Sequence, residues 1–423
     1  MSERGILAGI DYGDPVVKYR GRKILRIARL IAGREVEHGL PMAIDAFYAL
    51  YLPAPIVDEE AGEAAPIHRA LVEALLNSGA SAHLRSRTIM DSVTSSVAAG
   101  LFLAETRAMA RIASSQREGE GRSRELEGAA RALAERIVDR VAREVEVVKR
   151  IKSLIEGQEA GRVSAFATEE YGYELLRLAR NADVRRILEV LRGLKPWEID
   201  VPGKRERSRR GEIHGYELGR DVERVATPSL VLPDELFYLK YVEGRLVIYE
   251  KALVTSRGPI YLLVDKSGSM DGPKMTWAKA VAIAMYMRAL KESRELYFRF
   301  FDSVPYQLVS IGKKPRAEAV AKFVDYVARV KGSGGTDISR ALLTACSDIR
   351  AARVGSQSDV VLITDGIDRV AEHAVSTCMK RANSRLVSVM IQGDNRSLKK
   401  ISWKYYAVVK LDREDVLKVV EMK

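Results

Sequence analysis

The most constraining feature of this sequence is the alternation of short, mainly apolar runs with helical stretches after residue 258. The apolar runs are Ile260–Val264, Tyr297–Phe301, Val360–Ile363, Leu386–Ile391 and Tyr406–Val409. Helical patterns occur at about 274–291, 315–330, 337–352, 369–382 and 413–421. This alternation predicts a doubly wound, mostly parallel α/β sheet, whose strands are apolar throughout because helices cover both faces. We expect Tyr306–Ile311 to add a short antiparallel edge strand.

The first half of the chain shows apolar residues at helical spacing, from about residue 20 to residue 190. In 123–156 they recur every three or four positions, and charged residues fill the other faces. Further helices are predicted at 22–33, 40–51, 65–78, 83–115 and 169–192. The predicted fold class is therefore an all-helical N-terminal domain followed by the α/β domain.

The periodic pattern breaks between Pro196 and Pro228. Residues Lys204–Arg210 carry six charges among seven positions and have no apolar period, which predicts an exposed, mobile linker. Docking of Arg205–Arg210 to anionic lipid or RNA is the functional alternative. The expected domains are a helical domain (1–195), a basic linker and connector (196–256) and the α/β domain (257–423).

Charge and composition limit the kind of partner and the compartment. Residues 229–423 hold 32 Lys and Arg against 22 Asp and Glu, whereas residues 1–228 hold 37 against 35, so the second half favours acidic partners. The spacing of Cys346 and Cys378 fits no disulfide framework or zinc site, and we expect both to be buried core thiols. With no signal-peptide core and no membrane-length apolar stretch, we expect a cytoplasmic protein. Only nine residues are Asn or Gln, a bias typical of thermophile proteins.

Oxygen-bearing side chains occur at two predicted strand ends and at one helix start. The first strand of the α/β domain ends in a D-x-S-G-S sequence that holds Asp265, Ser267 and Ser269. Thr336 begins a predicted helix, and Asp365 follows a later strand. Each motif alone would also fit a polar turn. Because ligands of open α/β sheets bind at the carboxyl ends of strands, we expect the five side chains to converge.

Five oxygen ligands without His or Cys are typical of Mg²⁺, with Mn²⁺ or Ca²⁺ as alternatives. Two carboxylates and three neutral hydroxyls leave the ion short of negative charge, which favours an additional anionic ligand from a partner. We predict Asp265, Ser267, Ser269, Thr336 and Asp365 as the metal site, and no catalytic or cofactor-binding residues.

This pattern resembles the metal-ion-dependent adhesion site of von Willebrand factor A (VWA) domains, and the resemblance covers about 257–423. It implies a Rossmann-like fold. It also implies that Ser267, Ser269 and Thr336 contact the ion, while Asp265 and Asp365 hold coordinated waters. All five positions match the family pattern.

A narrower resemblance is to the bacterial ViaA and CoxE-like proteins. It is carried by Gly219–Val225, Leu232–Leu239, Gly244–Glu250, Trp277–Ala280 and Gly334–Asp337. These proteins pair a helical region with a VWA domain and act with MoxR-class AAA+ ATPases. The resemblance implies an adaptor whose metal binds an Asp or Glu of such an ATPase. Its helical domain would bind a client protein during assembly, remodelling, or metal or cofactor insertion.

Two other functions fit the sequence less well than the adaptor does. An aspartyl phosphotransferase needs a second carboxylate two residues after its Asp, where Ser267 stands, and Pro273 occupies a glycine position that a P-loop requires. RNA-binding proteins of the Ro type also join helices to a VWA domain. Residues 1–228, however, are nearly neutral and show no repeats or basic–aromatic interleaving. The sequence therefore favours a non-enzymatic adaptor, with RNA binding as the alternative.

Overall fold

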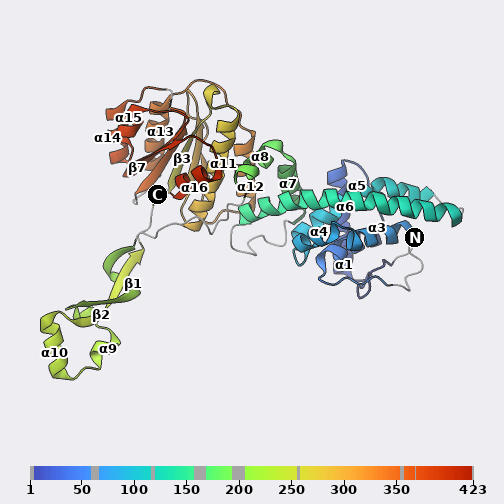
Figure 1. Ribbon diagram of the computed structural model, residues 1–423, viewed down its shortest axis with the longest axis horizontal. Coiled ribbons are helices and arrows are strands. Elements are labelled where there is room, and N and C mark those ends of the chain that lie inside the picture. The colour runs from blue at the N-terminus through green and yellow to red at the C-terminus, as the bar shows by residue number, and fades with distance from the viewer. Residues whose placement is uncertain are drawn as a thin grey trace. The chain divides into compact units, whose positions relative to one another are not determined.

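The computed structural model describes residues 4–58, 66–115, 120–156, 168–192, 205–254, 258–352, 357–366 and 368–421 (Figure 1). The chain divides into two compact units. The helical unit consists of Met1–Pro196, Asp271–Met287 and Lys314–Gly332. The sheet unit consists of Trp197–Met270, Arg288–Lys313 and Ser333–Lys423. Two helices that follow the first strands of the sheet in sequence are therefore grouped with the N-terminal helices.

The helical unit is built around one long helix, α6 (Glu120–Glu156), which contacts α3, α4, α5 and α7 (Figure 1). The N-terminal helices are α1 (Pro15–Ala32), α2 (Leu40–Tyr51), α3 (Pro66–Asn77), α4 (Ser81–Thr88), α5 (Ser92–Ser115), α7 (Thr168–Arg180) and α8 (Ala182–Val190). The same unit contains α12 (Ala317–Arg329) and most of α11 (Pro273–Lys291). The predicted helical N-terminal region is confirmed. No helix among the described residues is long and apolar enough to cross a bilayer.

Two of the predicted long helices are each interrupted by a capping residue. The expected helix 83–115 is split into α4 and α5 at Met90, whose φ is 59°, and at Asp91, which accepts hydrogen bonds from the backbone N–H and the hydroxyl of Thr94. The expected helix 169–192 is split at Asn181, whose side chain accepts from the backbone N–H of Asp183 at 2.9 Å. The side chains of Asp and Asn accept hydrogen bonds from the unpaired N–H groups of a first helical turn, so a new helix can begin at these residues. The apolar spacing of the sequence continues across the break, which is why one long helix was predicted.

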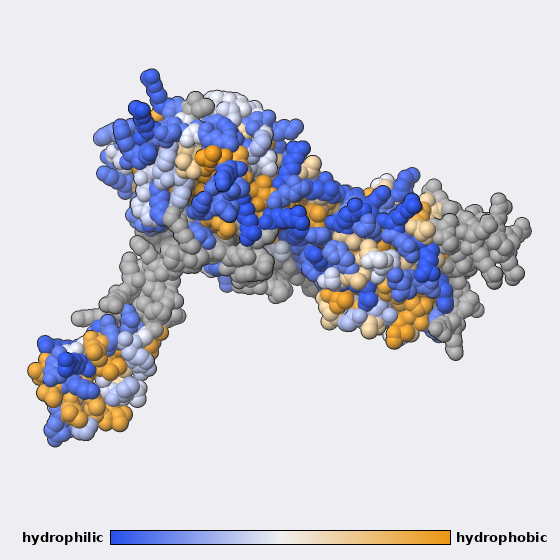
Figure 2. Space-filling model, viewed as in Figure 1, coloured by the Kyte–Doolittle hydropathy of each residue, from blue (hydrophilic) through white to orange (hydrophobic). Residues whose placement is uncertain are grey.

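The predicted mobile linker is wrong for residues 205–219, because they form a strand. Strand β1 (Arg205–Gly219) pairs antiparallel with β2 (Leu246–Val254), and η3 (Val222–Arg224), α9 (Thr227–Leu230) and α10 (Asp234–Glu243) lie between them in sequence. Two strands pair through hydrogen bonds between their backbone N–H and C=O groups. A polar segment can therefore form a strand beside a partner strand even when its apolar residues do not alternate. Figure 2 shows apolar surface on the segment between β1 and β2, in which Val231, Tyr238 and Val242 are each more than half exposed.

The main sheet confirms the predicted α/β fold. Its strand order is β5-β4-β3-β6-β7-β8, and every pair is parallel except β4 with β5. The strands are β3 (Ile260–Asp265), β4 (Leu296–Phe301), β5 (Val309–Ile311), β6 (Ser358–Thr364), β7 (Ser384–Ile391) and β8 (Lys404–Val408). Strands β3 and β6 are buried at every position, as expected for strands that are covered on both faces.

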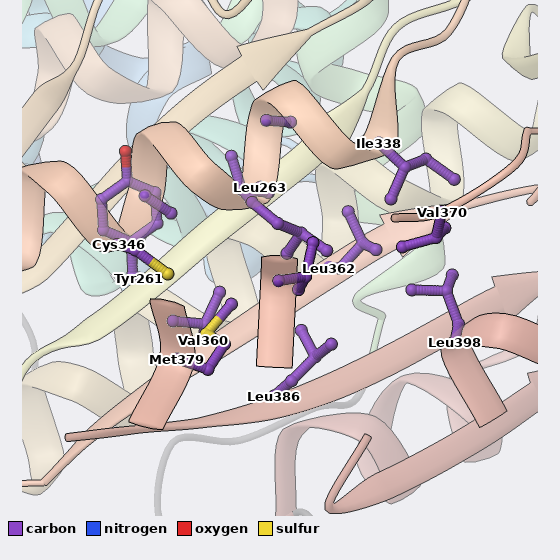
Figure 3. Packing of buried hydrophobic residues seen from close by; sticks show 14 of the residues in the cluster. Tyr261, Leu263, Ile338, Cys346, Val360, Leu362, Val370, Met379, Leu386 and Leu398 are labelled. Atoms are coloured by element: carbon purple, nitrogen blue, oxygen red, sulfur yellow. The ribbon is translucent and has the colours of Figure 1, made fainter. Parts of the chain in front are cut away.

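The remaining helices of the sheet unit are α13 (Ile338–Ala351), α14 (Glu372–Arg381), α15 (Arg396–Ile401) and α16 (Arg413–Glu421), of which only α15 was not predicted. Side chains of α13, α14 and α15 pack on β3, β6 and β7 in one apolar cluster (Figure 3). Cys346 is buried in this cluster, whereas Cys378 is only partly buried against it, so the second expected core thiol lies nearer the surface. Strands β3 and β6 are parallel neighbours in the sheet, so their carboxyl ends meet at one edge.

Candidate metal centre

The D-x-S-G-S loop begins at the buried end of β3. The Asp265 side chain is fully buried; its Oδ1 accepts a hydrogen bond from the backbone N–H of Ser267 at 2.8 Å. Its Oδ2 accepts from the hydroxyl of Thr364, at the end of β6, at 2.6 Å. Thr364 Oγ1 in turn accepts from the N–H of Gly366 at 3.0 Å. A single carboxylate therefore connects the loops after two neighbouring strands.

The hydroxyls of the two serines of the loop lie side by side. Ser267 Oγ and Ser269 Oγ are 3.1 Å apart, and the short helix η4 (Gly268–Met270) carries the second of them. Ser267 is buried and Ser269 is exposed, while the Met270 side chain that follows is fully buried. The buried methionine anchors the turn, so the hydroxyl of Ser269 is held at the surface.

The loop that carries Thr336 is joined to the D-x-S-G-S loop through backbone hydrogen bonds. Gly268 N donates to Gly334 O at 3.0 Å, and Ser333 N donates to Lys266 O at 2.6 Å. Gly334 has a φ of 93°, and a Cβ there would lie 2.8 Å from Asp302 Oδ2, so the close approach requires glycine. Thr336 itself is half-buried, just before α13. Its loop is thus placed beside the serines by the backbone.

Asp365 follows β6 and is almost completely buried. Burial raises the pKa of Asp265, and the negative charge of Asp365 raises it further, whereas hydrogen bonds from Thr364 and Ser267 oppose the rise. A cation beside these two buried carboxylates would stabilise the ionised form of Asp265. Within the described residues no three His, Cys, Asp or Glu side chains form a metal-binding group, so a metal here would also need the hydroxyls.

Asn395 braces the Asp365 loop and was missed in the sequence analysis. Its side-chain amide donates to Gly366 O at 2.9 Å and to Asp368 O at 2.8 Å, and its Oδ1 caps α15. The carboxylate of Asp368 accepts from the N–H of Ile338 at 2.9 Å, which joins this loop to the start of α13. From the sequence, Asn395 could be recognised only as a residue that can cap a short helix. The two backbone carbonyls that accept from its amide belong to a loop about 30 residues away in sequence.

A second missed group lies at the end of β4. Lys266 Nζ is 3.1 Å from Asp302 Oδ2 and 3.2 Å from Ser333 Oγ, and it lies 4.3 Å from the centre of the Tyr306 ring. Tyr306 also donates to Asp302 at 2.6 Å. Burial would raise the pKa of Asp302, but the hydrogen bonds and the ammonium lower it below its ordinary value. The ammonium within the D-x-S-G-S loop is thereby neutralised by a carboxylate outside the candidate ligand set.

The architecture and this loop arrangement define a domain class. Residues 260–416 match the sequence model of the von Willebrand factor type A domain. The C-terminal region is therefore a VWA domain with a Rossmann-like sheet, preceded by a helical region. The Mg²⁺ ligand roles of the five side chains remain a prediction.

Relatives of the chain resemble it over different lengths. An uncharacterised protein of Methanocaldococcus jannaschii is 26% identical over 398 residues, which cover 89% of this chain and 90% of that protein. A VWFA domain-containing protein of Acidianus two-tailed virus is 25% identical over 261 residues, covering 56% of this chain but 27% of the viral protein.

Among solved structures, BatB of Bacteroides thetaiotaomicron aligns with 39% of this chain and 96% of its own, at 13% identity and a TM-score of 0.31. A von Willebrand factor type A protein of Catenulispora acidiphila aligns with 42% of this chain and 43% of its own, at 17% identity and a TM-score of 0.32.

Proposed function

We propose that the VWA domain binds Mg²⁺ through Asp265, Ser267, Ser269, Thr336 and Asp365, and that the bound ion accepts an Asp or Glu side chain from a partner protein. The observation that carries this proposal is the pair of buried carboxylates beside an exposed serine hydroxyl. The bound ion would supply a Lewis-acidic position with a deficit of negative charge. The residues of this chain would hold that ion and leave one side open to a partner.

The proposed partner is a MoxR-class AAA+ ATPase, and the proposed role is that of an adaptor. The VWA domain supports a role in protein interaction. The resemblance of the connector and of Gly334–Asp337 to ViaA and CoxE-like proteins favours this ATPase class. In this proposal ATP hydrolysis belongs to the partner and the chain catalyses no reaction. The helical unit would recognise the client whose assembly, remodelling or metal insertion the ATPase drives.

The metal step is tested on the full chain by isothermal titration with Mg²⁺ and by thermal unfolding with and without the ion. Asp265→Asn keeps the shape and one oxygen that can accept from the Ser267 N–H, but it replaces the oxygen that accepts from Thr364 with an amide nitrogen and removes the charge. We expect the fold to survive and Mg²⁺ affinity to fall about 100-fold or more. Ser267→Ala removes one oxygen. Glu372→Gln, a partly exposed acid of α14 that pairs with Lys400, is the matched control and should bind normally.

The partner step is tested by co-purification with a MoxR-class ATPase in Mg²⁺ and in EDTA. We expect retention only with Mg²⁺, and its loss in Asp265→Asn but not in Glu372→Gln. Equal retention in EDTA would refute the metal-bridged interaction. If Mg²⁺ binds as expected but no ATPase of this class is retained, the metal site stands and the choice of partner is wrong.

A further inference from the structure

The helical unit contains a groove of about 540 Å³ whose walls carry four arginines. Three of them, Arg140, Arg143 and Arg150, project from one face of α6, because spacings of three and seven residues return to the same side of a helix. Arg185 comes from α8. The α6 residues span roughly 15 Å along the helix axis, or about three turns. The groove is therefore long enough for a short helical or extended peptide segment.

Three of the four arginines are held by ion pairs that a partner could replace, whereas Arg185 donates to the backbone carbonyl of Ala179 at 2.7 Å. Arg140 pairs with Glu105 at 3.2 Å, Arg143 with Asp139 and Arg150 with Glu146. The side chains of Arg140 and Arg143 are 64% and 75% exposed, respectively. Such surface pairs are weak, and each guanidinium has five N–H donors in a planar fork that fits a carboxylate. Replacing these acids with acids of a partner therefore costs little free energy.

The rest of the lining selects among anionic partners. Val147 and Leu188 supply apolar contacts, with Leu188 7% exposed, which suits an apolar side chain as an anchor. Glu144 and Glu189 also line the groove. These two carboxylates would repel a continuous phosphate backbone, and among the described residues the lining has no aromatic ring on which a base would stack. A protein segment with spaced acids and an apolar residue fits this mixture better than RNA.

We propose that this groove is the docking site for an acidic, amphipathic segment of a partner protein, whose carboxylates pair with Arg140, Arg143, Arg150 and Arg185 and whose apolar side chain contacts Val147 and Leu188. This inference deepens the proposed function, since it rests on recognition of a client by the helical unit. It involves no metal ligand, so it stands or fails independently of the Mg²⁺ site.

The probe is a fluorescein-labelled peptide of Glu and Leu at helical spacing, about three to four turns long. Binding to the full chain is measured by anisotropy in EDTA, which separates the groove from any metal-dependent interaction. The double variant Arg140→Gln and Arg143→Gln should bind the peptide about tenfold more weakly. The double variant Arg131→Gln and Arg136→Gln has the same charge change on α6 outside the groove lining and should bind normally.

Two further probes define the ligand. A peptide with Gln in place of Glu should lose most of its affinity, and Val147→Ala should weaken the Leu-containing peptide more than a version with Ala in place of Leu. The proposal is overturned if both double variants bind the Glu peptide equally, if the Gln peptide binds as well, or if single-stranded RNA binds more tightly than the peptide and depends on the groove arginines.

Discussion

Two sets of ion pairs, one in each unit, lie in opposite environments. In the sheet unit, Arg294 and Asp359 are paired at 2.7 Å with each side chain 2% exposed, and Glu292 bridges Arg294 and Arg288. On α6 of the helical unit, Arg140 and Arg143 are more than 60% exposed and pair with surface acids. A buried ion pair holds its two side chains in one arrangement, because separating them would leave a buried charge without a partner. An exposed ion pair is weak, so its side chains can form pairs with other charged groups. The sheet unit therefore suits a preformed ion site, and the helical unit suits an adaptable docking surface.

The largest expected effect is the loss of a buried pair in the sheet unit. Asp359→Asn removes the charge that faces both Arg294 and Arg385, at 2.7 and 2.6 Å. Although burial alone would raise the pKa of Asp359, the two arginines hold it below its ordinary value, so the carboxylate is the form that the fold stabilises. We expect the free energy of unfolding in urea to fall by about 3–5 kcal/mol.

The matched comparison for that variant is Glu318→Gln, which removes one acid from an exposed pair with Lys322 on α12. Its urea midpoint should not change measurably. If both substitutions shifted the midpoint equally, the contrast between buried and exposed charges would have no energetic basis.

A buried histidine gives the helical unit its own pH dependence. Burial lowers the pKa of His38 to about 4, and its Nε2 is 3.0 Å from the hydroxyl of Thr106. The unfolded histidine takes up a proton near its ordinary pKa of about 6.5, whereas the folded one does not, so stability falls as the pH drops from 6.5 to 4. The loss attributable to this group is about 3 kcal/mol over that window.

Urea unfolding of the wild type and of His38→Gln at several pH values between 7 and 4 measures this contribution. The wild type should lose more stability than the variant over that range. If stability depended on pH in the same way in both proteins, the folded His38 would take up its proton as readily as the unfolded one. Its burial would then make no contribution to the pH dependence of the helical unit.

A smaller effect is expected at the brace behind the candidate metal site. Asn395→Asp keeps the oxygen that caps α15 but removes the amide that donates to Gly366 O and Asp368 O. Because that amide holds the Asp365 loop, we expect Mg²⁺ affinity to fall about 10- to 100-fold while the domain stays folded. Titration calorimetry measures the affinity, and circular dichroism checks the fold. Unchanged affinity would place the brace outside the metal site.

The sequence predicted what depends on local pattern and missed what depends on tertiary contacts. Buried parallel strands are continuous apolar runs, so β3, β6 and β7 were recognised, and D-x-S-G-S was visible because its oxygens are adjacent in sequence. Thr364, Asp302 and Asn395 were missed because each acts on a loop that is distant in sequence. For the same reason β1 was taken for a linker, since its partner strand begins only at Leu246.

The smallest expected effect tests the exposed pairs and the groove together. Arg180 Nε is 3.0 Å from Glu144 Oε2, with side chains 40% and 17% exposed, respectively, and Glu144 also lines the arginine groove. A double-mutant cycle with Arg180→Gln and Glu144→Gln should give a coupling energy of about 0.2–1 kcal/mol, reduced at high salt. Glu144→Gln should at the same time strengthen binding of the acidic peptide, because it removes a carboxylate that repels the ligand. A coupling as large as that of a buried pair, or weaker peptide binding, would mean that Glu144 organises the groove, and the helical unit would then use its charges as the sheet unit does.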